Sequence, residues 1–349
     1  MNKEEVFINY YFKKRIRRVT HAPDELHKIY SSKYFEWIIP FLKKYNITDA
    51  PLILCCNTLY QLPDFFTLGK NSFFVADYYL HSFLYDFNYS LSESYLNDLC
   101  INLFLKTYME KAYLKNNIDS CFFLCSTSPT IEEYKHSDDY INENKMSHLV
   151  EITDLQEEFT FLHEAGHFLL EKYKSLKESE FYKTVKKEYF NIKCQNKDDF
   201  YDECFCDYVS SIYILNETYD KCSFEKSDYF SLFFRTLLCV YIIEFFSKCQ
   251  ELDPVLFFEY SDEQLQMILL RYHNLYIVIQ QFLKDKNCKE DLDIINDIYQ
   301  QAICEFKEIG NNIRKLSVYI EQEIDNGKID VNLTIKEKKE FIKNFLKLL

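Results

Sequence analysis

The strongest constraint on the fold is the scarcity of glycine and proline, because the 349-residue chain contains only 4 Gly and 6 Pro. These two residues most often interrupt helices and strands, so the chain can form long, unbroken elements. It also contains 29 Tyr and 32 Phe, whose rings need a large buried core. The composition disfavours a collagen, a β-propeller and an enzyme that binds phosphate through a Gly-rich loop.

The charge of the chain disfavours two classes of partner. Lys and Arg number 41 and Asp and Glu number 55, which gives a formal net charge of −14. Such a charge repels phosphate backbones and anionic lipids, so we expect no nucleic acid and no membrane as partner. The most apolar stretch, residues 229–246, is interrupted by Arg235 and Glu244 and is a poor candidate for a membrane span.

The cysteines and the N-terminal residues indicate a cytoplasmic protein. The count of 13 Cys is odd, and the chain is much larger than the small secreted domains that disulfides stabilise. We therefore expect reduced thiols. Residues 1–18 carry acidic and then basic side chains without the apolar core of a signal peptide, so we expect no export.

Residues 1–126 form the predicted N-terminal α/β region. Helical spacing over residues 24–45 predicts a helix that Pro40 kinks. A capping-box pattern at residues 90–93 predicts the start of another helix. Short apolar runs bounded by polar residues predict three buried strands, over residues 51–56, 73–76 and 121–125. The second helix lies between the last two strands, which predicts a strand, helix, strand unit with a short sheet.

Residues 127–150 are polar and predict a surface loop or a lid. We assign residues 151–220 to a pair of helices and residues 221–349 to a helical C-terminal region, which makes the predicted fold α+β and mostly helical. The apolar stripe of the long helix in that region packs inside a bundle or against a regulatory partner. The predicted helices after the loop cover residues 153–173, 199–215, 229–249, 262–283, 291–323 and 334–349.

The segment that points to a chemical function is an HExxH pattern at His163, Glu164 and His167. On a helix, histidines four residues apart lie about 6 Å apart along the axis and about 40° apart around it, so both can bind one metal ion. Glu164 projects about 100° away, beside the ion, where it can take a proton from water. A capping-box pattern at residues 153–156 predicts the start of this helix. Two histidines without a metal are the alternative interpretation.

A catalytic zinc ion needs a third protein ligand, and a later helix offers Glu203. Asp207 lies one turn along the same face, where it can accept a hydrogen bond from a ligand histidine and fix its tautomer. Carboxylates at this spacing are also typical of a solvated helix face. Other donors stay open as the third ligand, namely the carboxylates of Asp202 and Asp207 and the thiolates of Cys204 and Cys206.

This pattern resembles the gluzincin metallopeptidases, in which HExxH is followed on a later helix by ExxxD. The resemblance covers residues 160–210 and includes Thr160, three residues before the first histidine. It implies a zincin-like pair of active-site helices, a Zn²⁺ cofactor and hydrolysis of peptide bonds. The placement of the motif also resembles, more weakly, the phage-exclusion Lit-type and the ImmA/IrrE-type intracellular metallopeptidases, which cut specific intracellular proteins.

The sequence therefore predicts a zinc endopeptidase that cleaves a specific intracellular protein in phage defence or regulation. We expect Glu164 to act as general base and His273 or Tyr208 to assist as a second electrophile, unless these two side chains are structural. One rival is a non-catalytic helical binding protein with a structural or vestigial zinc site. Another is a protease held inactive by a thiolate or by the polar loop. Glu164 favours catalysis, because a structural zinc site needs no general base.

Overall fold

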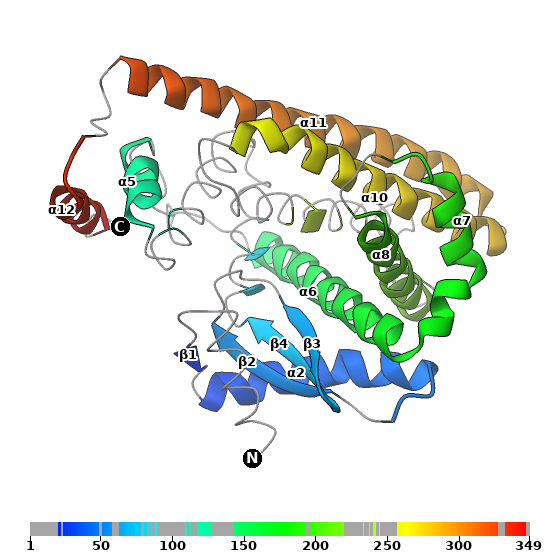
Figure 1. Ribbon diagram of the computed structural model, residues 1–349. Helices are drawn as coiled ribbons and strands as arrows, with labels where there is room; N and C mark the ends of the chain where they lie inside the picture. The colour runs from blue at the N-terminus through cyan, green and yellow to red at the C-terminus, as the bar shows by residue number, and fades with distance from the viewer. Residues whose placement is uncertain are drawn as a thin grey trace. The chain divides into compact units, whose positions relative to one another are not determined.

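The protein is mostly helical with one small sheet, as a computed structural model shows (Figure 1). The predicted α+β, mostly helical fold is confirmed. The chain divides into two compact units, unit 1 with residues 1–84, 151–241 and 266–303, and unit 2 with residues 85–150, 242–265 and 304–349. The structure describes residues 20–21, 24–48, 51–57, 63–77, 117–127, 143–192, 196–219, 257–326 and 332–346, and isolated residues within 80–112 and 233–244.

The sheet belongs to unit 1 and has the strand order β1-β2-β4-β3. Its strands are β1 (Thr20–His21), β2 (Leu52–Asn57), β3 (Asp64–Leu68) and β4 (Asn71–Asp77). β2 and β4 pair in parallel, and the other two pairs are antiparallel. The predicted strands at residues 51–56 and 73–76 are therefore confirmed, whereas β1 and β3 are not among the predicted strands. Gly69, with φ +63°, forms the tight turn between β3 and β4, a conformation that favours glycine.

Helices make up most of the remaining described chain. The predicted helices at residues 24–45, 153–173, 199–215, 262–283 and 291–323 are confirmed, and the one at residues 334–349 is confirmed over its described part, which ends at residue 346. The predicted helices over residues 229–249 and after residue 90 lie outside the described residues, as do residues 128–142 of the predicted polar loop. In the described part of the chain, no helix could cross a membrane. The helices are α2 (Asp24–Lys44), α5 (Ile118–Thr127), α6 (Glu143–Lys172), the 3-10 helix η2 (Lys174–Glu178), α7 (Glu180–Glu188), α8 (Lys197–Thr218), α10 (Phe257–Asp285), α11 (Lys289–Asp325) and α12 (Ile335–Leu346).

Aromatic rings fix α6 against the sheet and against α2. The ring of Phe161 on α6 stacks on Phe74 of β4 at 5.4 Å and on Tyr34 of α2 at 3.7 Å. About two turns further along α6, Phe168 lies 5.2 Å from Phe65 of β3. These contacts leave the opposite face of α6 directed away from the sheet.

The predicted strand at residues 121–125 is wrong, because these residues belong to α5. The helix begins with a cap, in which the backbone N–H of Ser120 donates to the side-chain oxygen of Asn117 at 3.1 Å. The run Cys-Phe-Phe-Leu-Cys is apolar at every position, and a short buried helix and a short buried strand then have the same pattern. The predicted strand, helix, strand unit therefore lacks its last strand.

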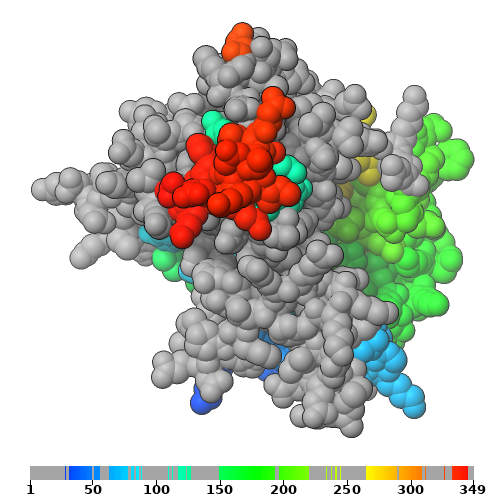
Figure 2. All heavy atoms as spheres, turned by 60° about the vertical axis from the view of Figure 1, so that its left-hand side comes forward, coloured from blue at the N-terminus to red at the C-terminus, as the bar shows by residue number. Residues whose placement is uncertain are grey.

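In unit 2, α5 packs against α12 (Figure 2). Phe122 and Phe341 meet edge to face with their ring centroids 5.1 Å apart. The predicted capping box at the start of α12 is present, because the Glu337 side chain accepts from the Thr334 backbone N–H at 2.8 Å and Glu337 N–H donates to the Thr334 hydroxyl at 3.4 Å. Sequence alone thus identified the start of this helix.

The capping box predicted at residues 153–156 is wrong. α6 already begins at Glu143, and Thr153 and Gln156 are fully buried within it. Residues 143–150 of the predicted polar loop are therefore helical. The pattern is misleading because a threonine and a glutamine three residues apart can also lie on a buried helix face.

Candidate metal centre

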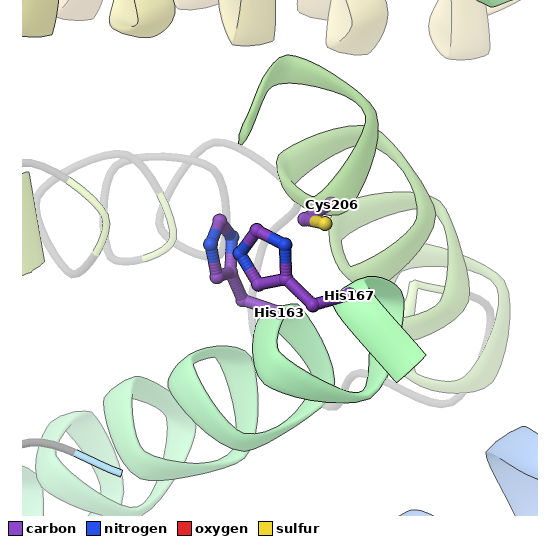
Figure 3. A group of neighbouring side chains, drawn as sticks. All are labelled: His163, His167 and Cys206. Carbon is purple, nitrogen blue, oxygen red and sulfur yellow. The ribbon is translucent and has the colours of Figure 1, made fainter. Parts of the chain in front are cut away.

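The HExxH residues lie on α6 where α8 passes very close to it. A Cβ atom at Gly166 would lie 3.0 Å from each of the Cα, Cβ and Sγ atoms of Cys206 on α8. Such contacts leave no room for a side chain, so the close approach of the two helices depends on this glycine. The approach brings His163, His167 and Cys206 together (Figure 3).

The carboxylate of Glu203 lies beside both histidines. Its Oε2 is 3.1 Å from Nε2 of His163, and its Oε1 is 3.5 Å from Nε2 of His167. Two ligands at about 2.0–2.1 Å from a tetrahedral zinc ion lie about 3.3 Å from each other, so the observed separations are close to those of a zinc site. Imidazole nitrogens and a carboxylate are also donors that zinc prefers. The three residues therefore offer donors of the type that zinc prefers, and the glutamate lies close to both histidines.

Asp207 lies behind His163 and orients its ring. Its Oδ1 is 2.9 Å from Nδ1 of His163, and its side chain is completely buried. A carboxylate at Nδ1 fixes the tautomer in which Nε2 is available as a ligand. The structure thus brings together His163, His167, Glu203 and Asp207, the residues that the sequence selects as ligands and supporting partner.

Arg271 of α10 holds both carboxylates of the centre. Its Nε and Nη2 donate to the two carboxylate oxygens of Asp207 at 2.9 Å each, and its Nη1 lies 3.1 Å from Oε2 of Glu203. Burial alone would raise the pKa of both carboxyl groups. Arg271, together with His163, outweighs burial, so that the pKa of Asp207 is lowered and that of Glu203 is strongly lowered. Sequence reasoning does not identify Arg271, because no motif marks it and it lies 64 residues after Asp207.

The two histidines titrate in opposite directions. Burial lowers the pKa of both rings. At His163 the hydrogen bonds to Asp207 and Glu203 outweigh burial and raise the pKa to about 10, whereas the pKa of His167 stays below its usual value. At neutral pH a metal ion must therefore displace a proton from His163, and metal affinity should rise with pH toward 10.

Cys206 gives the centre a second set of donors. Its sulfur and one ring nitrogen each of His163 and His167 all lie within 4.8 Å of one another. Burial, and then the charges of Glu203 and Asp207, raise the pKa of this thiol well above its usual value. The thiol must lose a proton before it can bind a metal ion, whereas Glu203 is already ionised. Cys206 and Glu203 are therefore alternative third donors, and Glu203, which is paired with Arg271, is the one that is already ionised.

Asp202 and Cys204, the other alternative ligands, are engaged elsewhere. Asp202 forms an ion pair with Lys177 at 2.6 Å and accepts a hydrogen bond from the hydroxyl of Tyr182. Cys204 is buried two residues before Cys206 and so faces another side of α8. Among the described residues, neither joins the donors that converge with the two histidines.

Glu164 lies at the edge of the centre. It is partly exposed, and its negative charge contributes to the raised pKa of Cys206. As the residue after His163 it projects about 100° away from that ligand. Glu164 therefore directly follows one candidate ligand on α6 and projects to another side of the helix.

Tyr208 and His273, the two predicted electrophiles, have partners outside the centre. The ring of Tyr208 stacks on Phe181 of α7 with the centroids 4.0 Å apart. His273 lies about 200° around α10 from Arg271. Its Nδ1 is 2.8 Å from the hydroxyl of Tyr299 on α11. The geometry gives both side chains structural contacts and supports neither as an electrophile.

A second group of metal-binding side chain types lies elsewhere in unit 1 and consists of His81, Asp154 and Glu157. The ammonium group of Lys33 is 2.7 Å from a carboxylate oxygen of Asp154 and 2.7 Å from one of Glu157. Nδ1 of His81 is 3.1 Å from the same oxygen of Glu157. Lys33 thus already supplies a cation here, and the group is an ion-pair network between α2 and α6.

Comparisons with known proteins leave the chain without an assigned family. No protein family, no curated protein and no solved structure matches it. The fold and the site define a mostly helical α+β protein in which two helices bring two histidines and a glutamate together. The resemblance of residues 160–210 to gluzincins remains a prediction.

We predict that Gly166→Ala destabilises the protein by about 1–3 kcal/mol, because the added methyl group forces α8 away from α6. The sign is diagnostic, since Gly→Ala inside a helix otherwise stabilises by up to about 1 kcal/mol. Urea denaturation measures the effect. Adding Cys206→Ala, which removes one of the contacting atoms, should recover part of the loss. A Gly166→Ala protein as stable as wild type would show that the two helices tolerate a side chain at their crossing.

We predict that Arg271→Met lowers the free energy of unfolding by about 3 kcal/mol or more, because Asp207 stays buried without its main counter-charge. Lys44→Met provides a matched control, since it removes the exposed ion pair of Lys44 with Glu217 and should cost less than about 1 kcal/mol. Urea denaturation with a chelator present measures both variants. Equal losses in the two variants would contradict the role of Arg271.

Proposed function

We propose that the protein is a zinc-dependent endopeptidase. The observation that carries this proposal is the carboxylate of Glu203, which lies 3.1 Å from a ring nitrogen of His163 and 3.5 Å from one of His167. Asp207 at the back of His163 and Glu164 at the edge of the centre are the further groups that such an enzyme needs. The motif spacing and the side-chain distances both support the same ligand set.

His163, His167 and Glu203 would hold the zinc ion, which would supply a Lewis acid able to lower the pKa of water toward about 7 and to polarise the scissile carbonyl. Glu164 accepts the proton of the attacking water and then donates it to the leaving amine. Asp207 keeps the ring of His163 in its ligand orientation. Arg271 keeps Glu203 and Asp207 ionised, so that both act as carboxylates at neutral pH.

The remaining parts of the proposal rest on composition and resemblance. They are a cytoplasmic location, a specific intracellular protein as substrate, a role in phage defence or regulation, and a regulatory partner that contacts the C-terminal helices. The net charge of −14 supports the expectation that neither nucleic acid nor a membrane is a partner.

A second candidate function is a non-catalytic binding protein with a structural zinc ion, and Cys206 is the observation that favours it. With its thiolate as a fourth protein ligand the centre is closed, as in structural zinc sites. A catalytic centre has three protein ligands and one position for water. The number of protein ligands therefore separates the two functions.

We predict one zinc ion per chain and a centre without sulfur ligation. Glu203→Gln should weaken zinc binding by about 100-fold or more, since it removes a charged donor, whereas Cys206→Ser should leave it within a few-fold of wild type. Competition with a chromophoric chelator measures both affinities. In the cobalt-substituted protein, a sulfur-to-cobalt charge-transfer band that disappears in Cys206→Ser would instead establish the closed, structural centre.

We predict that Glu164→Gln lowers the rate of peptide hydrolysis by at least about 10²-fold and leaves zinc content unchanged, because the base is lost and every ligand remains. A peptide library prepared from a cell extract, analysed by mass spectrometry, reveals cleavage whatever the sequence of the substrate. The matched control is Glu171→Gln on the same helix, an exposed residue whose carboxylate accepts a hydrogen bond from Thr67. Cleavage by Glu164→Gln at the rate of Glu171→Gln would refute the mechanism.

A further inference from the structure

A cavity of about 550 Å³ lies within unit 1 and is lined by residues of α7, α8 and α10. Its volume falls within the range of about 300–1,000 Å³ that is usual for ligand sites. The centre described above makes no use of this cavity. Its walls are apolar and include Phe181, Val185, Ile212, Ile277, Val278 and Phe282.

An aromatic surface forms part of the cavity. Phe181 of α7 and Tyr208 of α8 both line it, and their rings are nearly parallel, with an angle of 12° between them. Stacked rings present a flat apolar surface at low entropic cost, because each side chain has only two rotatable bonds. Such a surface suits an apolar or aromatic side chain.

Asn274 of α10 also lines the cavity and gives it a buried polar group. The residue is only 3% exposed, and its amide nitrogen has no hydrogen-bond partner in the described structure. A buried amide without a partner is destabilising, and such groups are rare in native proteins unless they have a function. The nitrogen itself is covered by protein, so a peptide carbonyl in the cavity can accept from it only after the side chain of Asn274 rotates toward the cavity.

Charged residues at the cavity are predominantly acidic. Glu180, Glu188 and Asp285 carry three carboxylates, and Lys286 carries the one ammonium group among the lining residues. All four residues are exposed, so they lie where the cavity meets solvent. Their summed charge attracts a basic ligand and repels an acidic one.

We propose that this cavity binds a peptide segment in which apolar residues are flanked by basic ones. The apolar side chain packs on Phe181 and Tyr208, and the basic side chains pair with the exposed carboxylates. A backbone carbonyl accepts from Asn274 once that side chain has rotated toward the cavity. The segment belongs to the protein substrate, an assignment that rests on the proposed peptidase function. Tyr208 directly follows Asp207 on α8, and Asn274 lies one turn beyond Arg271 on α10, so the cavity and the candidate metal centre share two helices.

The test uses the full-length Glu164→Gln protein, with and without one equivalent of zinc, so that binding is measured without cleavage. The probes are two fluorescein-labelled peptides with a central Leu-Phe pair, flanked by two Lys on each side in one and by two Glu in the other. Fluorescence anisotropy should show at least tenfold tighter binding of the Lys peptide. A high-salt titration should weaken this binding.

Two substitutions in the cavity test where the peptide binds. Asn274→Leu should weaken binding of the Lys peptide at least tenfold while the thermal midpoint stays the same or rises, because the variant removes the unpartnered amide. Phe181→Ala should weaken binding by removing the stacked surface. Ile335→Ala, a substitution of an exposed apolar residue on α12, should leave binding unchanged.

Three outcomes would overturn the proposal. The first is equal affinity for the two peptides. The second is unchanged binding of the Lys peptide in Asn274→Leu and in Phe181→Ala. The third is displacement of the peptide by 2-phenylethylamine that binds with the same affinity as the peptide, which would indicate a small-molecule site. Binding without zinc separates this proposal from the peptidase function. If the peptide binds as expected and no hydrolysis is found for wild type, the peptidase function fails and the peptide site remains. If hydrolysis is found without binding in the cavity, only the cavity proposal fails.

Discussion

The buried carboxylate of Asp207 is the interaction on which the arrangement of the centre depends. A carboxylate without solvent contact is strongly destabilising unless charged groups replace its lost hydration. Arg271 provides two hydrogen bonds and His163 a third contact, all at 2.9 Å. These three residues belong to α8, α10 and α6, so one carboxylate fixes the relative positions of three helices in unit 1. Asp207 also raises the pKa of His163, so the carboxylate that links the three helices also affects the protonation state of a candidate metal ligand.

The two faces of α6 make different contacts. Phe161 and Phe168 are about 140° to 160° around the helix from His163, and they pack on β4 and β3. The face with the histidines is therefore held by the sheet from behind and by α8 in front. Gly166 sets the distance on the second side, because a larger residue would meet Cys206. The short apolar strands of the N-terminal region thus contribute to the centre indirectly, by fixing the helix that carries it.

Sequence analysis succeeded where the physical cause is local. The capping box of α12 and the apolar runs of β2 and β4 involve neighbouring residues, and the positions of Glu203 and Asp207 follow from helical spacing. It failed where the cause is tertiary. Residues 121–125 are helical because Asn117 caps α5 and because α12 packs against α5. The apolar pattern of these five residues predicts neither contact. The sequence does not mark Arg271 either, since its importance comes from the two carboxylates that it meets in space, that of buried Asp207 and that of partly exposed Glu203.

The charges at the centre bear on whether a bound zinc ion would leave a position open for water. Without a metal, Asp207 and Glu203 are ionised and Arg271 and His163 are protonated, so these four groups sum to zero. A zinc ion adds two charges and displaces the proton of His163, which leaves an excess of one positive charge in the set. Either the thiolate of Cys206 or the carboxylate of Glu164 can balance that excess. The two are in conflict, because the charge of Glu164 raises the pKa of Cys206 and so opposes formation of the thiolate. The negative charge of Glu164 therefore favours a protonated Cys206, three protein ligands and water in the fourth position.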